Sequence, residues 1–252
     1  MKATKLMRQD WDERARSDAF RYIASWRNVW DRDSFFASGE GDYLQLVAPF
    51  LELCGWELAG KAVLELGCGT GRMTRSFAQR AGRVLAVDIS EEMLHRAQSY
   101  LSDATNVVWI QGNGTDLSSV DTGTADFAFS YIVLQHLPAP PLAFRYVQEM
   151  IRILKPGGLF LFQFNGEQAP SMNWKGRAAW GLVDIPWTLG FRTVSRMIAK
   201  RLGLDPEFAG KSWRGASVKT SRMTEVVRAA GASVIEIKGE GTPMAWIGGS
   251  KS

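Results

Sequence analysis

The sequence has few cysteines, the residues that cross-link small or extracellular domains: only two of its 252 residues are cysteines. Cys54 and Cys68 stand apart, and no CxxC pair or cysteine–histidine cluster exists, which excludes a zinc site of the usual spacing. No apolar run approaches the roughly 20 residues of a transmembrane helix. The first residues also lack the apolar core of a signal peptide. We therefore expect a reduced, cytoplasmic protein without a metal site.

The sequence also lacks a large excess of either charge, since its net charge is only +4. The positive excess is local: residues 167–219 hold nine basic and four acidic side chains, and the rest of the chain is close to neutral. Nucleic-acid-binding domains usually carry a strong basic patch or stripe, so we expect no nucleic-acid partner. Any preference for an anionic partner belongs to this one segment.

The middle of the chain alternates short apolar runs with amphipathic stretches. The runs are rich in β-branched or aromatic residues and predict five strands, at 62–66, 83–88, 107–111, 126–131 and 159–164. Helical spacing of apolar residues predicts helices between them, and Ser90 is a suitable N-cap for one. The chain ends in a predicted helix (224–231), a strand (233–238) and a strand (243–248), the last two forming an antiparallel hairpin.

Strands that alternate with helices predict an α/β fold with a parallel sheet covered on both faces. We expect a Rossmann-like, doubly wound sheet of seven strands, mostly parallel with an antiparallel C-terminal hairpin strand. The predicted divisions are an N-terminal helical cap (1–58), a cofactor-binding core (59–166), an inserted lid (167–219), and a C-terminal helix and hairpin that complete the core (220–252).

Two flanking segments show helical periodicity. Residues 10–30 predict an amphipathic helix with one apolar stripe, formed by Phe20, Ile23, Trp26 and Trp30. Residues 187–202 repeat apolar residues at spacings of three and four, at Trp187, Phe191, Val194, Ile198 and Leu202. Their basic residues fall largely off this stripe. We interpret the second segment as a helix laid on the core with a solvated basic face, or as a surface for an anionic substrate or membrane.

A glycine-rich loop follows the first predicted strand, in the sequence VLELGCGTG (63–71). Its glycines allow a tight strand-to-helix turn and a close approach of the backbone to a ligand. Asp88 ends the next predicted strand, where a carboxylate can accept both hydroxyl protons of a ribose. The pattern predicts a bound nucleoside. The alternative, an NAD(P)-binding Rossmann oxidoreductase, requires a glycine at position 72, where Arg72 stands.

ELGCGTGR (65–72), followed by VDIS (87–90), resembles the class I S-adenosylmethionine-dependent methyltransferases. GNGTDL (112–117), DFAFSYIVLQHL (126–137) and ILKPGGLFLF (153–162) match later elements of that family. The resemblance covers about residues 60–166 and agrees with the reversed last strand. It implies S-adenosyl-L-methionine as the cofactor and transfer of its methyl group to an acceptor.

The same resemblance implies which residues face the cofactor. Glu65 would fix the methionine ammonium and Asp88 the ribose diol, while the backbone of Gly67, Gly69 and Gly71 would pass under methionine and ribose. Further expected contacts are Ile89 on the adenine face, Asn113 and Gly114 at the adenine edge, and Ser130 at the end of the fourth strand. Asn113 replaces the acid usual in the family, and its amide oxygen can still accept from the adenine amino group.

In the resembling family, an N-terminal helix and an insertion after the fifth strand cover the cofactor and hold the acceptor. Seven of the ten tryptophans fall in these regions, which suits an apolar pocket wall. We expect pocket rings from Tyr22, Tyr131, Trp187 and Trp213. The sequence motifs of nucleic-acid methyltransferases are missing. The expected acceptor is therefore an anionic or apolar small molecule, methylated on oxygen rather than nitrogen or carbon; a lipid-linked or macromolecular acceptor is the alternative.

The chain contains two histidines, His95 and His136. His95 falls within a predicted helix, and we expect it on the surface. His136 lies just beyond the strand 126–131, and strand ends on this side of a doubly wound sheet face the ligand crevice. An imidazole with an ordinary pKa of about 6.5 can accept a proton near neutral pH. We expect His136 either to act as the general base or to pack the following turn.

Overall fold

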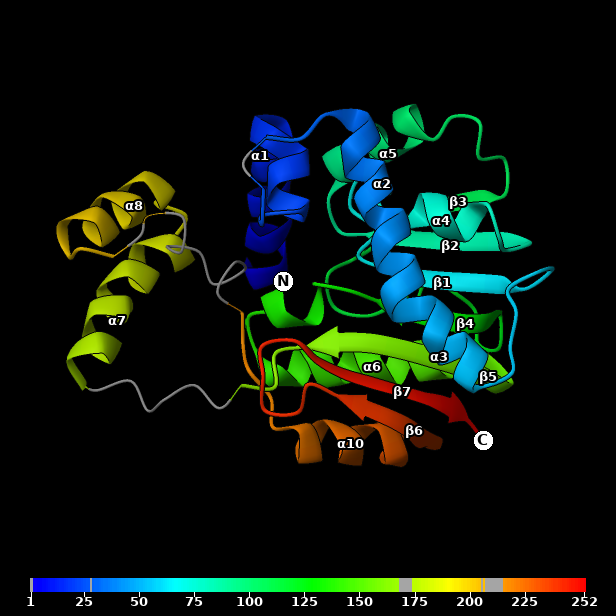
Figure 1. Cartoon of the computed structure of the whole chain (residues 1–252). Coiled ribbons are helices and arrows are strands. Elements are labelled where there is room, and N and C mark those ends of the chain that lie inside the picture. The colour runs from blue at the N-terminus through cyan, green and yellow to red at the C-terminus, as the bar shows by residue number, and fades with distance from the viewer. Residues whose placement is uncertain (1, 28, 168–173, 205, 207–214) are drawn as a thin grey trace.

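The computed structural model describes the chain except for residues 1, 28, 168–173, 205 and 207–214. It has a seven-stranded sheet in the order β3-β2-β1-β4-β5-β7-β6 (Figure 1). The strands are β1 Ala62–Leu66, β2 Arg83–Asp88, β3 Val107–Gln111, β4 Ala125–Ser130, β5 Leu154–Phe164, β6 Ala232–Lys238 and β7 Ala245–Lys251. β1 to β5 pair in parallel, and β7 runs antiparallel to both β5 and β6. The predicted fold class is confirmed.

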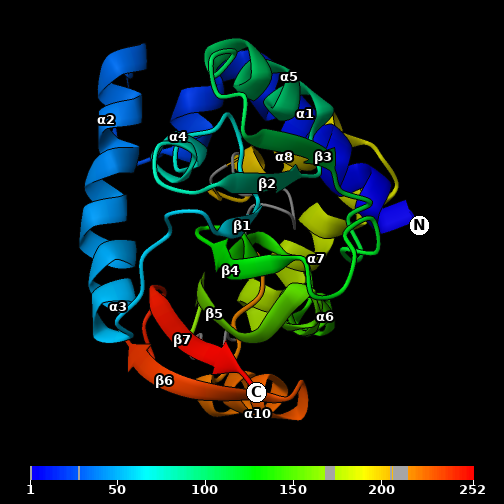
Figure 2. The same ribbon diagram turned by 90° about the vertical axis from the view of Figure 1, so that its right-hand side faces the viewer.

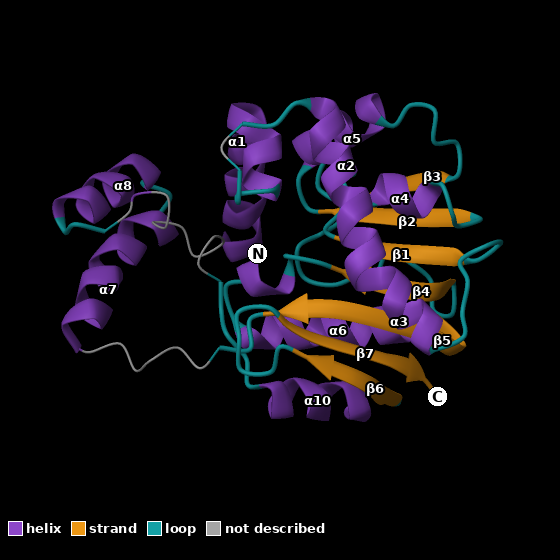
Figure 3. Cartoon of the chain, in the orientation of Figure 1, coloured by secondary structure: helices purple, strands orange, loops and turns teal. Residues whose placement is uncertain are grey.

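Helices cover both faces of this sheet (Figures 2 and 3). Their bounds are α1 Lys2–Ile23, α2 Arg32–Asp42, α3 Ala48–Leu53, α4 Thr74–Ala78, α5 Glu91–Tyr100, α6 Pro140–Ile153, α7 Trp174–Thr188, α8 Arg192–Arg201 and α10 Thr220–Ala229, with a π-helical turn at Tyr43–Val47 and a 3-10 turn at Leu134–His136. None of the described helices is long and apolar enough to cross a membrane.

The two faces of the sheet bury two separate apolar clusters because side chains alternate along each strand. On one face, Phe127 and Phe129 pack with rings from α3 and α4. On the other face, Leu64 and Phe160 pack with residues of α6 and α10. Strand β3 is the edge of the sheet and is only partly buried, so the interpretation of most strands as buried on both faces does not extend to it.

The N-terminal helix differs from its prediction over residues 10–30. α1 bends at Asp18, whose backbone leaves the helical region (φ −164°, ψ 87°) and whose Oδ1 accepts the Arg21 N–H at 3.1 Å. The carboxylate thus caps a final turn that ends at Ile23. Trp26 is 55% exposed beyond the helix. Trp30 folds back to donate its Nε1–H to the carbonyl of Ala24 at 2.8 Å.

The segment 187–202 also differs from the single helix that its periodicity predicts. Gly190 has a φ of +91°, which glycine tolerates best, and it separates α7 from α8. α8 packs against α7 through buried Ser195 and Ala199. The expected apolar stripe is not buried on the core, because Phe191 and Val194 are 61% and 40% exposed.

The buried aromatic cluster leads to a stability prediction. Phe127→Ala removes a ring that is fully buried between β4 and α4, so we expect the free energy of unfolding to fall by about 3–5 kcal/mol. The matched control Phe191→Ala removes an exposed ring and should change it by less than about 0.5 kcal/mol. Urea unfolding followed by circular dichroism measures both; equal losses would contradict the assignment of the core.

Candidate active site

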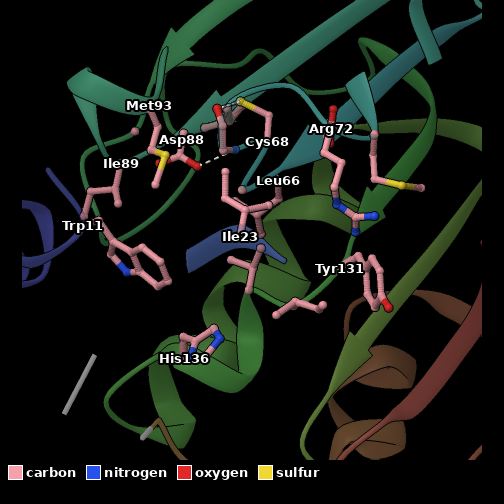
Figure 4. A pocket seen from close by; sticks show the side chains of 18 of the residues that line it. Trp11, Ile23, Leu66, Cys68, Arg72, Asp88, Ile89, Met93, Tyr131 and His136 are labelled. Carbon is pink, nitrogen blue, oxygen red and sulfur yellow. Dashed lines mark hydrogen bonds between the residues drawn. The ribbon is translucent and has the colours of Figure 1, made fainter. Parts of the chain in front are cut away.

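The glycine loop lies at the carboxyl end of β1, where the strand order reverses between β1 and β4. Gly67 and Gly69 have φ values of +77° and +54°. A Cβ at Gly67 would stand 2.1 Å from Cγ2 of Val133, and one at Gly69 would stand 2.8 Å from Cδ1 of Ile23. The loop therefore needs glycine for its conformation and for its close neighbours. Both glycines line the pocket shown in Figure 4.

Asp88 lies on the pocket wall at the end of β2, partly exposed. Its Oδ2 accepts the Gly69 N–H at 2.8 Å (Figure 4), and its Oδ1 accepts the Ser90 N–H, also at 2.8 Å. Each oxygen keeps a lone pair, so the carboxylate can still accept two hydroxyl protons. Burial raises its pKa to about 6, against the lowering effect of these backbone donors.

Glu65 is a second carboxyl in the pocket, and it is almost fully buried in β1. Its Oε2 accepts a hydrogen bond of 2.6 Å from the hydroxyl of Thr74. Burial raises its pKa to about 7, and the nearby Asp88 adds to the rise. A buried carboxyl in this state is stabilised as an anion when a cation binds beside it. The methionine ammonium that the sequence assigned to Glu65 is such a cation.

Helix α1 forms one wall of the pocket through Trp11, Tyr22 and Ile23. It is held against α5 at the start of that helix. The Ser90 hydroxyl donates to Oδ1 of Asp12 at 2.6 Å and accepts the Met93 N–H at 3.1 Å, as the predicted N-cap does. Tyr22 thus lines the pocket, and Trp11 is one of the seven tryptophans of the predicted cover regions that does so.

Arg72 lines the opposite end of the pocket from Asp88, beside Tyr131 (Figure 4). Its guanidinium is buried and pairs with Asp42 at 2.6 Å, and it lies 5.6 Å from the centre of the Tyr131 ring. Burial of the Tyr131 hydroxyl raises its pKa to about 12, against a lowering effect of Arg72. Sequence reasoning used Arg72 only to exclude the dinucleotide fingerprint. The position of Arg72 directly after the glycine loop was the feature of the sequence that could have indicated a pocket residue.

His136 lies on the 3-10 turn after β4 and faces Trp11 across the pocket, with ring centres 5.5 Å apart (Figure 4). Gln163 donates to Oε1 of Gln135 at 2.8 Å, which leaves the Gln135 amide N–H to donate to Nε2 of His136 at 3.3 Å. In this arrangement Nε2 is an accepting nitrogen. His95, by contrast, is exposed on α5, as expected.

The turn that carries His136 is conformationally strained. Ile132 has a φ of +58°, unusual for a β-branched residue, and its N–H donates to Oε1 of Gln163 at 3.1 Å. Ile132 lines the pocket. Strained backbone held by surrounding contacts is typical of functional sites. The strain thus lies next to Tyr131, at the carboxyl end of β4.

Several predicted contact residues do not line this pocket. A Cβ at Gly71 would meet Leu101, so this glycine serves packing with α5. The Asn113 amide oxygen accepts the backbone N–H groups of Thr115 and Asp116 within its own loop. Gly112, and not Asn113, lines the pocket at this point of the chain. The other residues outside the pocket are Gly114, Ser130, whose hydroxyl donates to the Leu66 carbonyl at 3.2 Å, and Trp187, which is buried on α7. Trp213 lies outside the described residues.

The strand order, the reversed β7, the glycine loop and the acid at the end of β2 together define a nucleoside-binding, Rossmann-like domain of the methyltransferase type. Residues 64–162 match the family described as methyltransferase domain. The match covers less than half of the chain and confirms, for this part, the resemblance to the class I S-adenosylmethionine-dependent methyltransferases.

Relatives and solved structures agree with this assignment. The chain is 34% identical over 111 residues to the ubiquinone biosynthesis O-methyltransferase of Xanthomonas oryzae pv. oryzae, covering 43% of this chain and 45% of that protein. It is 36% identical over 135 residues to the biotin biosynthesis bifunctional protein BioHC of Teredinibacter turnerae, covering 50% and 22%. The chain thus spans less than half the length of these relatives. Magnesium protoporphyrin IX methyltransferase from Synechocystis, solved with bound SAH, has the same fold (TM-score 0.63, 19% identity, 99% and 100% coverage).

The two buried carboxyls lead to a pH prediction. Because the folded-state pKa values of Glu65 and Asp88 lie at about 7 and about 6, above their ordinary values, the folded protein binds more protons than the unfolded chain in this range. Ionisation of these groups therefore costs stability as the pH rises from about 5 to about 8. Glu65→Gln keeps the acceptor for Thr74 without the charge, and it should become more stable relative to wild type over that range, by up to about 1.4 kcal/mol per pH unit.

Chemical denaturation of both proteins at several pH values in the absence of ligand measures this difference. Glu91→Gln, at an exposed position on α5, is the control and should show no such trend. A stability difference between Glu65→Gln and wild type that stays constant with pH would contradict the raised pKa.

Proposed function

We propose that the protein transfers the methyl group of S-adenosyl-L-methionine to a small-molecule acceptor with an apolar or aromatic body, and that the methylated atom is an oxygen. The observation that carries the proposal is the pocket itself, in which Asp88 and Glu65 present carboxyl groups beside the glycine loop. When bound, the cofactor supplies a methyl group already activated on a sulfonium, so the transfer is an in-line displacement.

The residues present fit this cofactor. Asp88 is oriented by two backbone N–H groups and retains acceptor capacity for a ribose diol. Ile89 and Met93 give that end of the pocket an apolar wall against which a base can pack. Glu65 is the buried carboxyl that a cationic ammonium would stabilise. The cofactor would thus lie with its nucleoside toward β2 and its amino-acid portion toward β1.

The acceptor side of the pocket is formed by α1 and the turn after β4. Tyr22, Tyr131 and Leu137 supply aromatic and apolar surface there, which favours a small molecule with an apolar body. The names of a ubiquinone O-methyltransferase and of a magnesium protoporphyrin methyltransferase among the similar proteins support this class of acceptor. We further propose that residues 167–219 act as a cover for the acceptor, because Arg192 of α8 binds α1 on the outer side of the pocket wall.

His136 is the proposed general base. Its Nε2 accepts a hydrogen bond from the Gln135 amide, so the same nitrogen can accept a hydroxyl proton if an acceptor displaces that amide. The Gln135 side chain is itself anchored by Gln163, which also donates to the carbonyl of Pro243 at 2.8 Å. Loss of the hydroxyl proton to His136 would leave an oxygen nucleophile aligned by the pocket walls.

Cofactor binding can be tested without knowing the acceptor. S-adenosylhomocysteine at a hundred-fold excess over its Kd should stabilise the protein by about 2.7 kcal/mol, and NAD should not. Asp88→Ala should weaken S-adenosylhomocysteine binding about 10- to 100-fold, because hydrogen bonds to a charged group are lost. Asp88 also accepts the N–H groups of Gly69 and Ser90, so we expect this variant to lose some stability as well.

Asp126→Ala is the matched control, because this carboxylate also accepts a backbone N–H, that of Ala62 at 2.8 Å, but lies at the amino end of the sheet. Titration calorimetry should show unchanged S-adenosylhomocysteine affinity for this variant. Stabilisation by NAD without stabilisation by S-adenosylhomocysteine would reverse the proposal in favour of an oxidoreductase.

The proposed base leads to a kinetic prediction. With an acceptor identified by labelled-methyl transfer to a cell extract and mass spectrometry, His136→Gln should lower kcat by roughly 10²- to 10⁴-fold. The affinity for S-adenosylhomocysteine should not change, since the ring faces Trp11 and not the glycine loop. His95→Gln, at an exposed position, should retain full activity. Near-normal kcat in His136→Gln would show that the reaction needs no base from this residue.

A further inference from the structure

The α7–α8 hairpin carries an unusual density of exposed apolar side chains. Seven large apolar residues that are 40% to 61% exposed fall within a stretch of 21 residues: Leu182, Ile185, Leu189, Phe191, Val194, Met197 and Leu202. Leu182 and Ile185 on α7 and Leu189 directly after it recur at spacings of three and four, on the side away from buried Val183 and Trp187. A solvent-exposed apolar surface of this kind marks an interaction site.

The same hairpin is strongly basic. Between Trp174 and Leu202 the sequence has six Lys or Arg residues and one acid, Asp184. On α8, Arg196, Lys200 and Arg201 are exposed, and the helix contains no acid. An exposed apolar surface flanked by Lys and Arg is complementary to an interface between anionic headgroups and acyl chains.

The hairpin is also placed where such docking would serve the site. It stands on the far side of α1 from the sheet (Figure 1). Arg192 at the start of α8 pairs with Glu13 at 2.5 Å and donates to the carbonyl of Leu6 at 3.3 Å. The opposite side of α1 lines the pocket through Trp11 and Ile23. A surface bound by the hairpin would therefore lie one helix away from the pocket.

We propose that the α7–α8 hairpin docks on the surface of a bilayer that contains anionic phospholipids. Its apolar side chains enter the boundary between headgroups and acyl chains, while Arg196, Lys200 and Arg201 bind phosphate groups. A second copy of this chain is disfavoured as the occupant, because two hairpins of the same positive charge repel each other. The docking does not depend on the chemistry proposed for the pocket, and an apolar acceptor would reach the pocket from the bilayer.

Flotation with vesicles tests the docking. We expect the wild-type protein to float with vesicles of phosphatidylcholine and phosphatidylglycerol at low salt, and to remain unbound with phosphatidylcholine alone. Ile185→Asp with Met197→Asp should weaken this binding at least about tenfold, because exposed side chains that enter the bilayer become charged. Leu53→Asp, which changes a side chain 60% exposed on α3, is the matched control and should bind as wild type does.

The contribution of charge is tested separately. Arg196→Gln with Lys200→Gln should weaken binding about 25-fold, at about fivefold for each charge removed. Arg222→Gln with Arg228→Gln, on α10, removes two charges elsewhere and should have little effect. Circular dichroism and S-adenosylhomocysteine affinity, measured on every variant, show whether the protein stays folded and whether the pocket is intact.

Three outcomes would overturn the proposal. The first is the absence of flotation with anionic vesicles at low salt. The second is flotation that the hairpin substitutions leave unchanged. The third is a concentration-dependent dimer, detected by light scattering, that Ile185→Asp with Met197→Asp dissolves, since this would make a second copy the occupant. A failure of cofactor binding in all proteins would instead contradict the proposed function and leave the docking result to stand by itself.

Discussion

The paired hydrogen bonds of the Asp88 carboxylate connect the elements around one end of the pocket. One oxygen holds the Gly69 N–H of the glycine loop and the other holds the Ser90 N–H at the start of α5. Ser90 in turn caps α5 and binds Asp12 of α1. A single side chain at the end of β2 thus connects the glycine loop, α5 and, through Ser90, α1. Burial raises its pKa, although these backbone donors lower it.

The cover formed by α1 combines contacts of two kinds. Trp11 and Ile23 make the pocket side apolar, whereas Asp12 and Glu13 bind α5 and α8 through polar contacts. Apolar contacts set the shape of the pocket, and the polar contacts fix where the helix lies.

The α7–α8 hairpin differs from the core in how its side chains are packed. Its helices pack on each other through a small interface at Val183 and Ala199 and leave large apolar side chains in solvent. Its basic charge is the main electrostatic asymmetry of an otherwise nearly neutral chain. The core carries the methyltransferase-like sheet and the glycine loop, whereas the hairpin concentrates exposed apolar side chains and basic charge.

The sequence by itself determined the sheet and the cofactor end of the site. Strands β1, β2 and β3 begin and end at the predicted residues, because each is a short β-branched run bounded by strong local turn signals. The positions of Gly67, Gly69, Asp88 and Glu65 follow from the same local pattern, since each lies in or directly after a strand whose carboxyl end faces the crevice.

Only the tertiary structure decided the walls of the pocket. The Asn113 amide oxygen accepts backbone N–H groups of its own loop, which turns it away from the pocket. Gly71 packs on Leu101, a contact that no local motif shows because the two residues are distant in sequence. Arg72 became a pocket residue only when α2 supplied Asp42 as its partner. Phe191 and Val194 of the predicted stripe remained exposed, because Gly190 turned the chain and divided the stripe between α7 and α8. Local pattern fixes which side of a helix is apolar, and long-range packing decides whether anything covers it.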